Sequence, residues 1–328
     1  MDRQLSVDVK LWKDEILALC EKFSRDGSAT VTKGQKVNKY RKGKKVTGGN
    51  KRVSKNRFKA VDNWDMGPWM CRRETQLEIE VYKKFAYISG ERIKAPGGFP
   101  LGLEDTFIAT VSGGFDSPVA AWLALRRGAP LIFVTMNSGL DEMTDKSDVE
   151  KKGPMLLKAY NEVKVLAEYM RGLPSNPILI VVPYGKILER LAAFGGKAGV
   201  SCLLCKRTIY RVAESIAYIY GAKGIVTGEI LGEQASQTAQ NLMVMQSVVT
   251  LPIHRPLFGY DKSEVIERSR QIGIYPVATI SQGACKGVPE HPTVRGNEDV
   301  VEEIEKKLNA ENIVEECIKN MKVIEITF

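Results

Sequence analysis

The residues whose types and spacing best suit chemistry lie between 106 and 122, where an apolar run leads into glycines and serines and then into a helical pattern. The glycines permit positive φ and close approach of the backbone, and the helix would begin with a serine cap followed by proline. Several N–H groups and two hydroxyls would then point at one anion. We therefore predict a pyrophosphate-binding loop with contacts from Ser112, Gly113, Gly114 and Ser117.

The loop carries an acid, Asp116, and lacks the lysine that a Walker loop places after its last glycine. Motor and GTPase chemistry are therefore disfavoured. As a bare hexamer, a glycine turn after a strand is also common as a structural connection. The Ser-Gly-Gly-x-Asp-Ser pattern resembles the signature of the ATP pyrophosphatase superfamily, and this resemblance implies cleavage of ATP between its α and β phosphates with adenylation of an acceptor oxygen.

Later segments supply further polar residues beyond predicted strand ends. A glycine turn follows the apolar run 224–227, and a stretch of amides and hydroxyls comes next. Lys262 and a nearby arginine could neutralise polyphosphate, with ordinary surface charge as the alternative. The two histidines lack metal-ligand spacing, and we expect neither to be a general base. The nucleotide contacts expected from these segments are Met136, Thr227, Gly228, Gln237 and Arg255.

Three cysteines form a second candidate site. Cys202 and Cys205 are spaced as Cys-x-x-Cys immediately before a helical pattern, so we expect the positive helix end to lower their pKa values. Cys285 follows in a glycine-containing loop, and the three thiols could hold an iron–sulfur cluster with one iron left open. A reducible disulfide, an incomplete zinc site and unrelated buried thiols are the alternatives. The remaining thiols are expected to be inert, and the last of them to lie in the core: Cys20, Cys71 and Cys317.

The alternation of apolar runs with helical patterns predicts an α/β fold, a doubly wound parallel sheet with helices on both faces. We place a small basic N-terminal α+β module at 1–100 and the nucleotide-binding domain at 101–328. Strands are expected at 106–111, 131–135, 178–182 and 224–227, and helices at 118–127, 155–171, 186–194 and 206–220. Further expected elements are a helix within 10–24, a strand-like alternation over 77–88, a capping box at 261–264 and one amphipathic tail over 302–321.

The formal charge of +9 is concentrated in residues 33–59, which hold twelve Lys or Arg and no acid. Such a stretch favours a polyanion partner, here RNA, with a solvated or folded-back segment as the alternative. The chain has no signal-peptide layout and no apolar run long enough to cross a membrane, so we expect a cytoplasmic protein without a membrane partner. Six cysteines in a chain of 328 residues are better explained as thiols than as a disulfide scaffold.

Together these motifs resemble the tRNA 4-thiouridine synthetase family, known also from thiamine biosynthesis as the ThiI type, from about Leu77 to Thr293. The resemblance implies that Asp116 belongs to the nucleotide and metal site and that Lys262 is needed for activity. It also implies that Cys285 handles persulfide sulfur, and that the Cys-x-x-Cys pair binds an iron–sulfur cluster with it, as in some archaeal members. The matching motifs are the Pro-Gly-Gly-Phe-Pro linker, the loop at 112–117, Cys205-Lys-Arg, Ile225-Val-Thr-Gly-Glu, Ala235-Ser-Gln-Thr, Arg255-Pro-Leu-x-Gly-x-Asp-Lys262 and the segment from Cys285 to His291-Pro-Thr.

Two departures from the family pattern shape the expectation. The roughly 100 residues before the loop are too few for the ferredoxin-like and THUMP pair that usually grips tRNA, so the basic stretch would replace or abbreviate that surface. The chain ends 43 residues after Cys285, leaving no room for a rhodanese domain to deliver sulfur. Sulfur is therefore expected from a cysteine desulfurase or from free sulfide.

The sequence thus predicts an ATP-dependent tRNA sulfurtransferase that adenylates a uridine O4 and replaces this oxygen with sulfur, with ATP, Mg²⁺ and a 4Fe–4S or 3Fe–4S cluster as cofactors. The catalytic residues would be Cys285, Lys262 and Asp116. One alternative is a small-molecule ATP pyrophosphatase that transfers sulfur or ammonia to an adenylated precursor, such as a thiamine-related one. Another is a nucleotide-responsive RNA-binding or cluster-carrier protein without turnover. Whether two chains pair as a homodimer is left open.

Overall fold

The computed structural model describes Ala95 and residues 97–139, 154–280 and 285–327, together with the backbone of five short strands before residue 90. The chain divides into two units, Met1–Ala95 and Pro96–Phe328. The predicted helix within 10–24, the basic stretch 33–59, Cys20 and Cys71 lie outside the described residues. Within the described ranges, no helix is both long enough and apolar enough to cross a bilayer.

The first unit contains two small antiparallel sheets of its own. Strands β4 (Glu78–Tyr82) and β5 (Phe85–Ser89) pair with each other, and β5 also pairs with β1 (Ser6–Asp8). Strand β2 (Thr30–Val31) pairs with β3 (Ala60–Val61). The alternation over 77–88 is therefore a hairpin of two strands, since folding back lets their backbone groups pair with each other.

The second unit is built on a six-stranded sheet in the order β10-β9-β6-β7-β8-β11, and only the edge strand β11 is antiparallel. This arrangement confirms the predicted doubly wound α/β fold. The order reverses between β6 and β9, and in such sheets ligands bind at this switch point. The strands are β6 (Phe107–Thr110), β7 (Leu131–Asn137), β8 (Ile178–Pro183), β9 (Ile225–Val226), β10 (Ile253–His254) and β11 (Lys322–Glu325).

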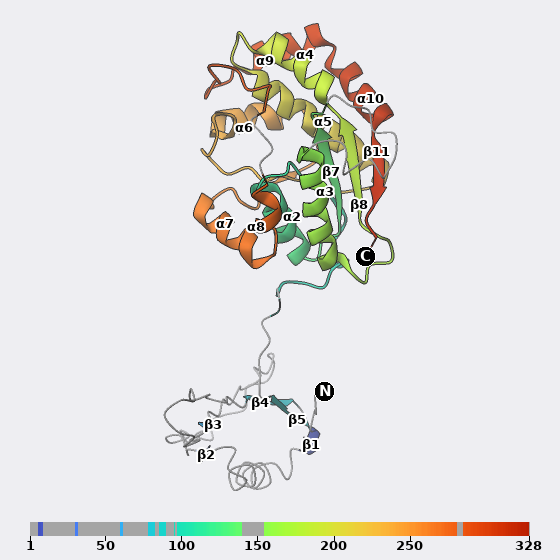
Figure 1. The fold of residues 1–328 in the computed structure, drawn as a ribbon, viewed down its shortest axis with the longest axis vertical. Helices are drawn as coiled ribbons and strands as arrows, with labels where there is room; N and C mark the ends of the chain where they lie inside the picture. The colour runs from blue at the N-terminus through green and yellow to red at the C-terminus, as the bar shows by residue number, and fades with distance from the viewer. Residues whose placement is uncertain are drawn as a thin grey trace, which may run out of the picture. The chain divides into compact units, whose positions relative to one another are not determined.

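Helices cover both faces of this sheet (Figure 1). One apolar core lies under α2 (Asp116–Arg126), α3 (Pro154–Ala167), α7 (Lys262–Gln271) and α8 (Tyr275–Ala278). The other lies under α4 (Gly185–Gly195), α5 (Ser201–Tyr220), α6 (Ala239–Gln246), α9 (Glu298–Leu308) and α10 (Ala310–Asn320). Short 3₁₀ turns complete the unit at η2 (Glu168–Met170) and η3 (Ala235–Gln237).

Strand residues alternate between these two cores, as the period of a strand requires. On β6, Ile108 packs on the α5 side and Ala109 on the α2 side, and both are fully buried. On β7, Phe133 packs on the α2 side and Val134 on the α5 side. Apolar residues at consecutive positions therefore serve both layers, which explains why these strands appear in the sequence as continuous apolar runs.

The amphipathic tail expected over 302–321 consists of two helices, α9 and α10, because Asn309 between them adopts a left-handed backbone with φ 53° and ends the first. One helix prediction needs correction. Helix α5 begins at Ser201 rather than at 206, so Cys202 and Cys205 lie within the helix and not before it. The prediction that Cys317 lies in the core is confirmed, since this thiol is fully buried on α10.

A buried charge network holds α9 against α5. Arg207 is 1% exposed and donates from Nε and Nη2 to the two carboxylate oxygens of Glu305, at 2.9 and 2.8 Å. Arg211, one turn later, also donates to Glu305, at 2.9 Å from Nη2. Because bidentate arginine–carboxylate pairs are geometrically specific, this network fixes the angle at which the C-terminal helices meet α5.

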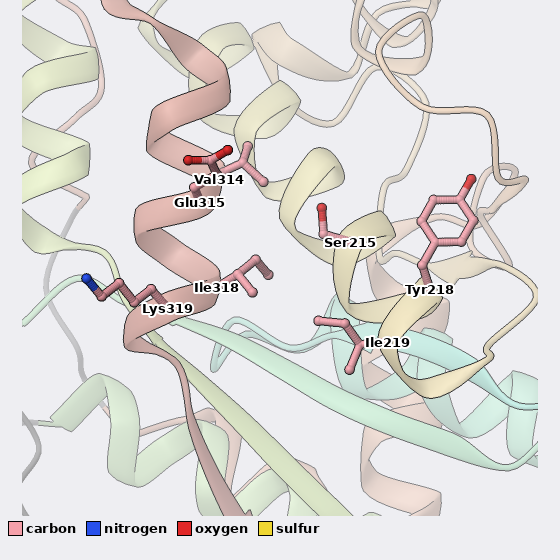
Figure 2. Close-up of a pocket in the computed structure, with 7 residues that line it drawn as sticks. All are labelled: Ser215, Tyr218, Ile219, Val314, Glu315, Ile318 and Lys319. Carbon is pink, nitrogen blue, oxygen red and sulfur yellow. The ribbon is translucent and has the colours of Figure 1, made fainter.

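The distant half of α5 forms a shallow apolar groove with α10 (Figure 2). Ser215 in this groove comes ten residues after Cys205, which corresponds to about 15 Å along a helix. The groove is therefore separate from the thiols at the start of α5. Its lining consists of Ser215, Tyr218, Ile219, Val314, Glu315, Ile318 and Lys319.

We predict that Arg207→Ala lowers the free energy of unfolding by about 3–5 kcal/mol, because it removes one partner of a buried ion pair. Urea titration of the purified chain measures this loss. Arg190→Ala is the matched control: Arg190 pairs with Glu316 at 3.1 Å between two helices, but both side chains are 45% exposed. The control should cost less than about 1 kcal/mol. Equal losses in the two variants would contradict the role given to the buried network.

Candidate nucleotide and thiol site

The predicted pyrophosphate loop lies between β6 and α2, beside the switch point of the sheet. Gly113 adopts φ 76°, which only glycine accepts readily, and turns the chain from strand to helix. The Ser112 N–H donates to the Ser117 hydroxyl at 3.0 Å, and the two hydroxyl oxygens are 3.2 Å apart. The loop is thus closed on itself by its two serines, and the N-terminus of α2 faces the same end of the sheet.

Two details of the loop differ from the sequence prediction. Helix α2 begins at Asp116 with Phe115 as its N-cap, and no side chain caps it. Ser117 is therefore the second residue of the helix and not, as the sequence predicted, its N-cap. Its hydroxyl instead accepts a hydrogen bond from the Ser112 amide. Gly114 does not have positive φ, and a Cβ there would make only ordinary contact with Ser112.

Gly228 brings the turn after β9 against the start of α2. A Cβ at Gly228 would lie 2.6 Å from the Ser117 nitrogen and 2.7 Å from the Asp116 carbonyl carbon, closer than any real contact. Both neighbouring atoms belong to the backbone, so they cannot rotate away. The two sides of the switch point therefore meet through a position that only glycine can fill.

Asp116 and Lys262 face each other across the site. The Lys262 ammonium donates to both carboxylate oxygens of Asp116, at 2.8 Å each, and lies 3.7 Å from a carboxylate oxygen of Glu233. Lys262 is the first residue of α7, whose predicted capping box between Asp261 and Glu264 is confirmed. The cap fixes the helix start, and this places the lysine 38% exposed above the loop.

Glu229, which follows Gly228, gathers the other polar residues of the site. It is 1% exposed and accepts from the Tyr210 hydroxyl at 2.6 Å, from Lys206 at 3.2 Å and also from Thr227. Burial alone would raise the pKa of Glu229, but Lys206 and its hydrogen-bond donors outweigh burial and lower that pKa below its usual range. Glu229 is therefore a carboxylate at neutral pH and a fixed anchor for cations.

Arg255 is one of those cations. Its Nε lies 3.2 Å from Glu229, and its Nη1 donates to Gln246 at 3.1 Å. Arg255 and Lys262 thus pair with different carboxylates, Glu229 and Asp116, although both come from the segment after β10.

Two other predicted contact residues have structural partners. Gln237 is buried, and its side-chain oxygen accepts from the Ile230 N–H at 3.4 Å while its backbone oxygen accepts from Gly232. It therefore braces the loop that follows β9. Met136, near the end of β7, is half-buried and packs against the core under α4 and α5.

The predicted lowering of the thiol pKa values in the Cys-x-x-Cys pair is wrong. Burial raises the pKa of Cys202, and it raises that of Cys205 to about 11. Both thiols lie in the first turns of α5, where loss of water outweighs the helix dipole and the nearby Lys206. The Tyr184 hydroxyl donates to the sulfur of Cys205 at 3.7 Å. Cys285 is exposed and near enough to raise the pKa values of both other thiols.

The residues fit the two inorganic groups to different degrees. The carboxylates of Asp116 and Glu233 both lie near the Lys262 ammonium. Two neighbouring carboxylates suit Mg²⁺, which binds one or two carboxylates together with phosphate oxygens. The three thiols are soft ligands of the kind that hold iron–sulfur clusters, and three of them would leave one iron without a cysteine. As these side chains stand, however, no three Cys, His, Asp or Glu of the described part of the chain are placed to hold a metal ion.

Several residues of the site were not singled out from sequence. Glu229 lies in the Ile225-Val-Thr-Gly-Glu motif quoted above. An acid so soon after a buried strand is unusual, and this could have marked Glu229 as a site residue. Lys206, Tyr210 and Glu233 join it only through tertiary contacts. Such contacts leave no trace in local spacing.

The fold and site define a doubly wound α/β domain with a glycine turn between strand and helix at its switch point, the place where such folds bind ligands. The chain belongs to the ThiI family, since the family model described as "Thiamine biosynthesis protein (ThiI)" matches residues 102–310. It is 37% identical over 253 residues to "Probable tRNA sulfurtransferase" of Methanosarcina mazei, covering 77% of this chain and 60% of that protein. It is 35% identical over 241 residues to "tRNA sulfurtransferase" of Thermoplasma acidophilum, covering 73% of this chain and 47% of that protein.

A solved structure agrees with these relatives. The crystal structure of a 4-thiouridine synthetase–RNA complex with bound ATP superposes with a TM-score of 0.67 at 30% identity, covering 76% of this chain and 63% of that one. The chain spans about 60% of the length of the first curated relatives that it matches. The resemblance seen in the sequence and the predicted fold class are both confirmed.

We predict that Gly228→Ala weakens Mg·ATP binding at least about tenfold, because the added methyl group must push the turn after β9 away from the start of α2. Isothermal titration with a nonhydrolysable ATP analogue measures this affinity. Gly259→Ala is the matched control, in the segment after β10, the strand parallel to β9. It should be neutral because nothing lies within 4 Å of an added Cβ and the φ of Gly259 is ordinary. Unchanged affinity in the Gly228 variant would contradict the close contact.

Proposed function

We propose that this chain is an ATP-dependent tRNA sulfurtransferase that forms AMP and pyrophosphate while it converts a tRNA uridine to 4-thiouridine. The observation that carries the proposal is the loop at the switch point, with Asp116 and Lys262 in contact beside it. The family to which the chain belongs and the tRNA sulfurtransferase relatives support it. Cytoplasmic location and tRNA as partner are part of the same proposal.

In this mechanism the loop amides and the N-terminus of α2 bind the β and γ phosphates that leave as pyrophosphate. Ser112 and Ser117 supply hydroxyls, while the backbone at Gly113 approaches the phosphates closely. Asp116 would hold Mg²⁺, which supplies charge neutralisation on the polyphosphate. Lys262, which contacts Asp116 beside the loop, carries the ammonium that would stabilise the negative charge that develops at the α phosphate.

The reaction needs two displacements. The O4 of the uridine attacks the α phosphorus and expels pyrophosphate, so that a carbonyl oxygen that leaves poorly becomes part of AMP, which leaves well. A sulfur nucleophile then attacks C4, and AMP departs with the former O4. Cys285 is the residue we assign to handling that sulfur, because it is exposed and the other two thiols beside it are partly buried.

The other predicted contacts divide between support and binding. The buried carboxylate of Glu229 contacts Thr227 and Arg255, and Gly228 lies against the start of α2. We propose that these three residues line the nucleotide beside the loop. Gln237 and Met136 act from beneath the site, by bracing the loop after β9 and by packing at the end of β7.

Cys202, Cys205 and Cys285 are proposed as ligands of an iron–sulfur cluster. When bound, such a cluster would offer an iron that is not occupied by a cysteine and can hold sulfur. Tyr184 and Lys206 would then lie beside the ligating sulfur atoms and compensate their negative charge. Free sulfide or a cysteine desulfurase is the proposed sulfur source.

We predict that Cys285→Ala loses more than about a hundredfold of 4-thiouridine formation, because the sulfur-handling thiol is gone. AMP formation that depends on unmodified tRNA should persist in the same variant. Both products are measured from one reaction, by nucleoside analysis of the tRNA and by chromatography of labelled nucleotide. Cys317→Ala serves as a control for removal of a buried thiol to which the proposal gives no role. Thiolation at the normal rate in the Cys285 variant would overturn the assignment, and pyrophosphate release without tRNA would favour a small-molecule acceptor.

Iron content gives a separate prediction. Protein purified without oxygen should be brown and contain about three or four irons per chain. Cys202→Ser should lose colour and iron, because thiolate ligands hold such clusters, whereas Cys317→Ala should keep both. Absorption spectra and iron analysis provide the readout. A colourless wild-type protein, or an iron-loaded Cys202 variant, would count against these ligands.

A further inference from the structure

A short segment after Cys285, residues 291–296, is held by two parts of the domain that lie far apart in the sequence. Its first contact is with the turn before α5, where the Thr293 N–H donates to the carbonyl oxygen of Gly199 at 3.0 Å. Gly199 has φ 68°, and a Cβ there would lie 2.4 Å from the carbonyl oxygen of His291. Because backbone meets backbone, only glycine fits at this contact.

The second contact is with Asn241 on α6, whose side chain is fully buried. Its Nδ2 donates to the carbonyl oxygen of Thr293 at 2.9 Å and to that of Ala235 at 2.7 Å. Its Oδ1 accepts from the Gly296 N–H at 2.7 Å. Both donors of the amide and its acceptor are therefore paired, and one side chain ties the segment 291–296 to η3.

Packing alone does not explain an asparagine at this position. The residues that follow it on α6 include Leu242, Val244 and Met245, which belong to the apolar core. Asparagine is a weak helix former, and a buried amide is costly unless its polar atoms are paired. An apolar side chain at 241 would also leave the groups that the amide now pairs without these partners. The position of Asn241 is therefore explained by the segments that it joins.

This clasp, formed by Gly199 and Asn241, limits where Cys285 can lie. Gly199 comes three residues before Cys202, so the segment 291–296 is fixed next to the start of the helix that carries the other two thiols. Residue 291 is six residues after Cys285, and six residues of chain span at most about 22 Å. Cys285 is thus an exposed thiol on a short tether whose far end is fixed.

We propose that Gly199 and Asn241 are positioning residues that clasp the segment 291–296 and so hold the Cys285 thiol in place for sulfur transfer. This inference rests on the proposed function, because it takes Cys285 as the residue that handles sulfur. A loosened clasp should uncouple the two displacements. ATP is still split, but water attacks the adenylated uridine in place of sulfur, and this restores uridine and releases AMP. A residue that only stabilised the fold would lower both products together.

The first test is Gly199→Ala, whose added methyl group must displace the His291 carbonyl. We expect the amount of 4-thiouridine formed per AMP to fall at least about tenfold, because a displaced thiol loses its alignment with the reacting carbon. Affinity for a nonhydrolysable Mg·ATP analogue should be unchanged. Gly221→Ala is the matched control at the other end of α5: its φ is 70°, and no described atom lies within 4 Å of an added Cβ. It should keep the normal ratio.

The second test removes the clasp from the side of α6. Asn241→Ala should lower the ratio of 4-thiouridine to AMP in the same way, and it should also lower the melting temperature because it leaves buried polar groups unpaired. Leu242→Ala is its control, since it opens a cavity in the core next to Asn241 but leaves the hydrogen bonds of the clasp intact. This control should melt at a lower temperature and keep the normal ratio.

Both products are measured from one reaction with unmodified tRNA, by nucleoside analysis and by chromatography of labelled nucleotide. A normal ratio in either clasp variant would overturn the proposal, as would an equal fall in Gly221→Ala or Leu242→Ala. Weaker binding of the ATP analogue in Gly199→Ala would count against it as well. If the wild-type chain forms neither AMP nor 4-thiouridine, the proposed function fails first. If the wild type and the Gly199 variant couple both products equally, this inference alone fails.

Discussion

The structure depends on the close approach of Gly228 to the first turn of α2. This contact joins the two halves of the sheet at the point where strand order reverses, and no side chain fits between them. On one side stand the pyrophosphate loop and Asp116, and on the other Thr227 and Glu229 with their cations. Because backbone meets backbone, the geometry of the nucleotide site is set by the fold itself rather than by flexible side chains.

Two carboxylates then divide the cations of the site between them. Glu229 is buried and pairs with Lys206 and Arg255, whereas Asp116 is partly exposed and pairs with Lys262 beside the loop. The buried group acts as a fixed frame, since moving a cation away from it would leave an unpaired charge inside the protein. The Asp116–Lys262 pair is partly exposed, so its two charges can separate at a lower cost than the buried ones.

Much of this arrangement could be predicted from sequence, because the loop glycines, the apolar strands and the capping box at Asp261 are local signals. Strands β10 and β11 were missed, since one has two residues and the other buries a single side chain, Ile324, toward the core within its four positions. The pKa direction of the Cys-x-x-Cys thiols was wrong because depth of burial is a tertiary property.

The proposed function requires this site to split ATP between its α and β phosphates and so to activate a tRNA oxygen. The most direct measurement is a single-turnover reaction with ATP labelled at the α phosphorus, unmodified tRNA, Mg²⁺ and sulfide under anaerobic conditions. We expect labelled AMP and 4-thiouridine to form in equal amounts, and only when tRNA is present. Labelled ADP as the product, or thiouridine formed without consumption of ATP, would contradict it.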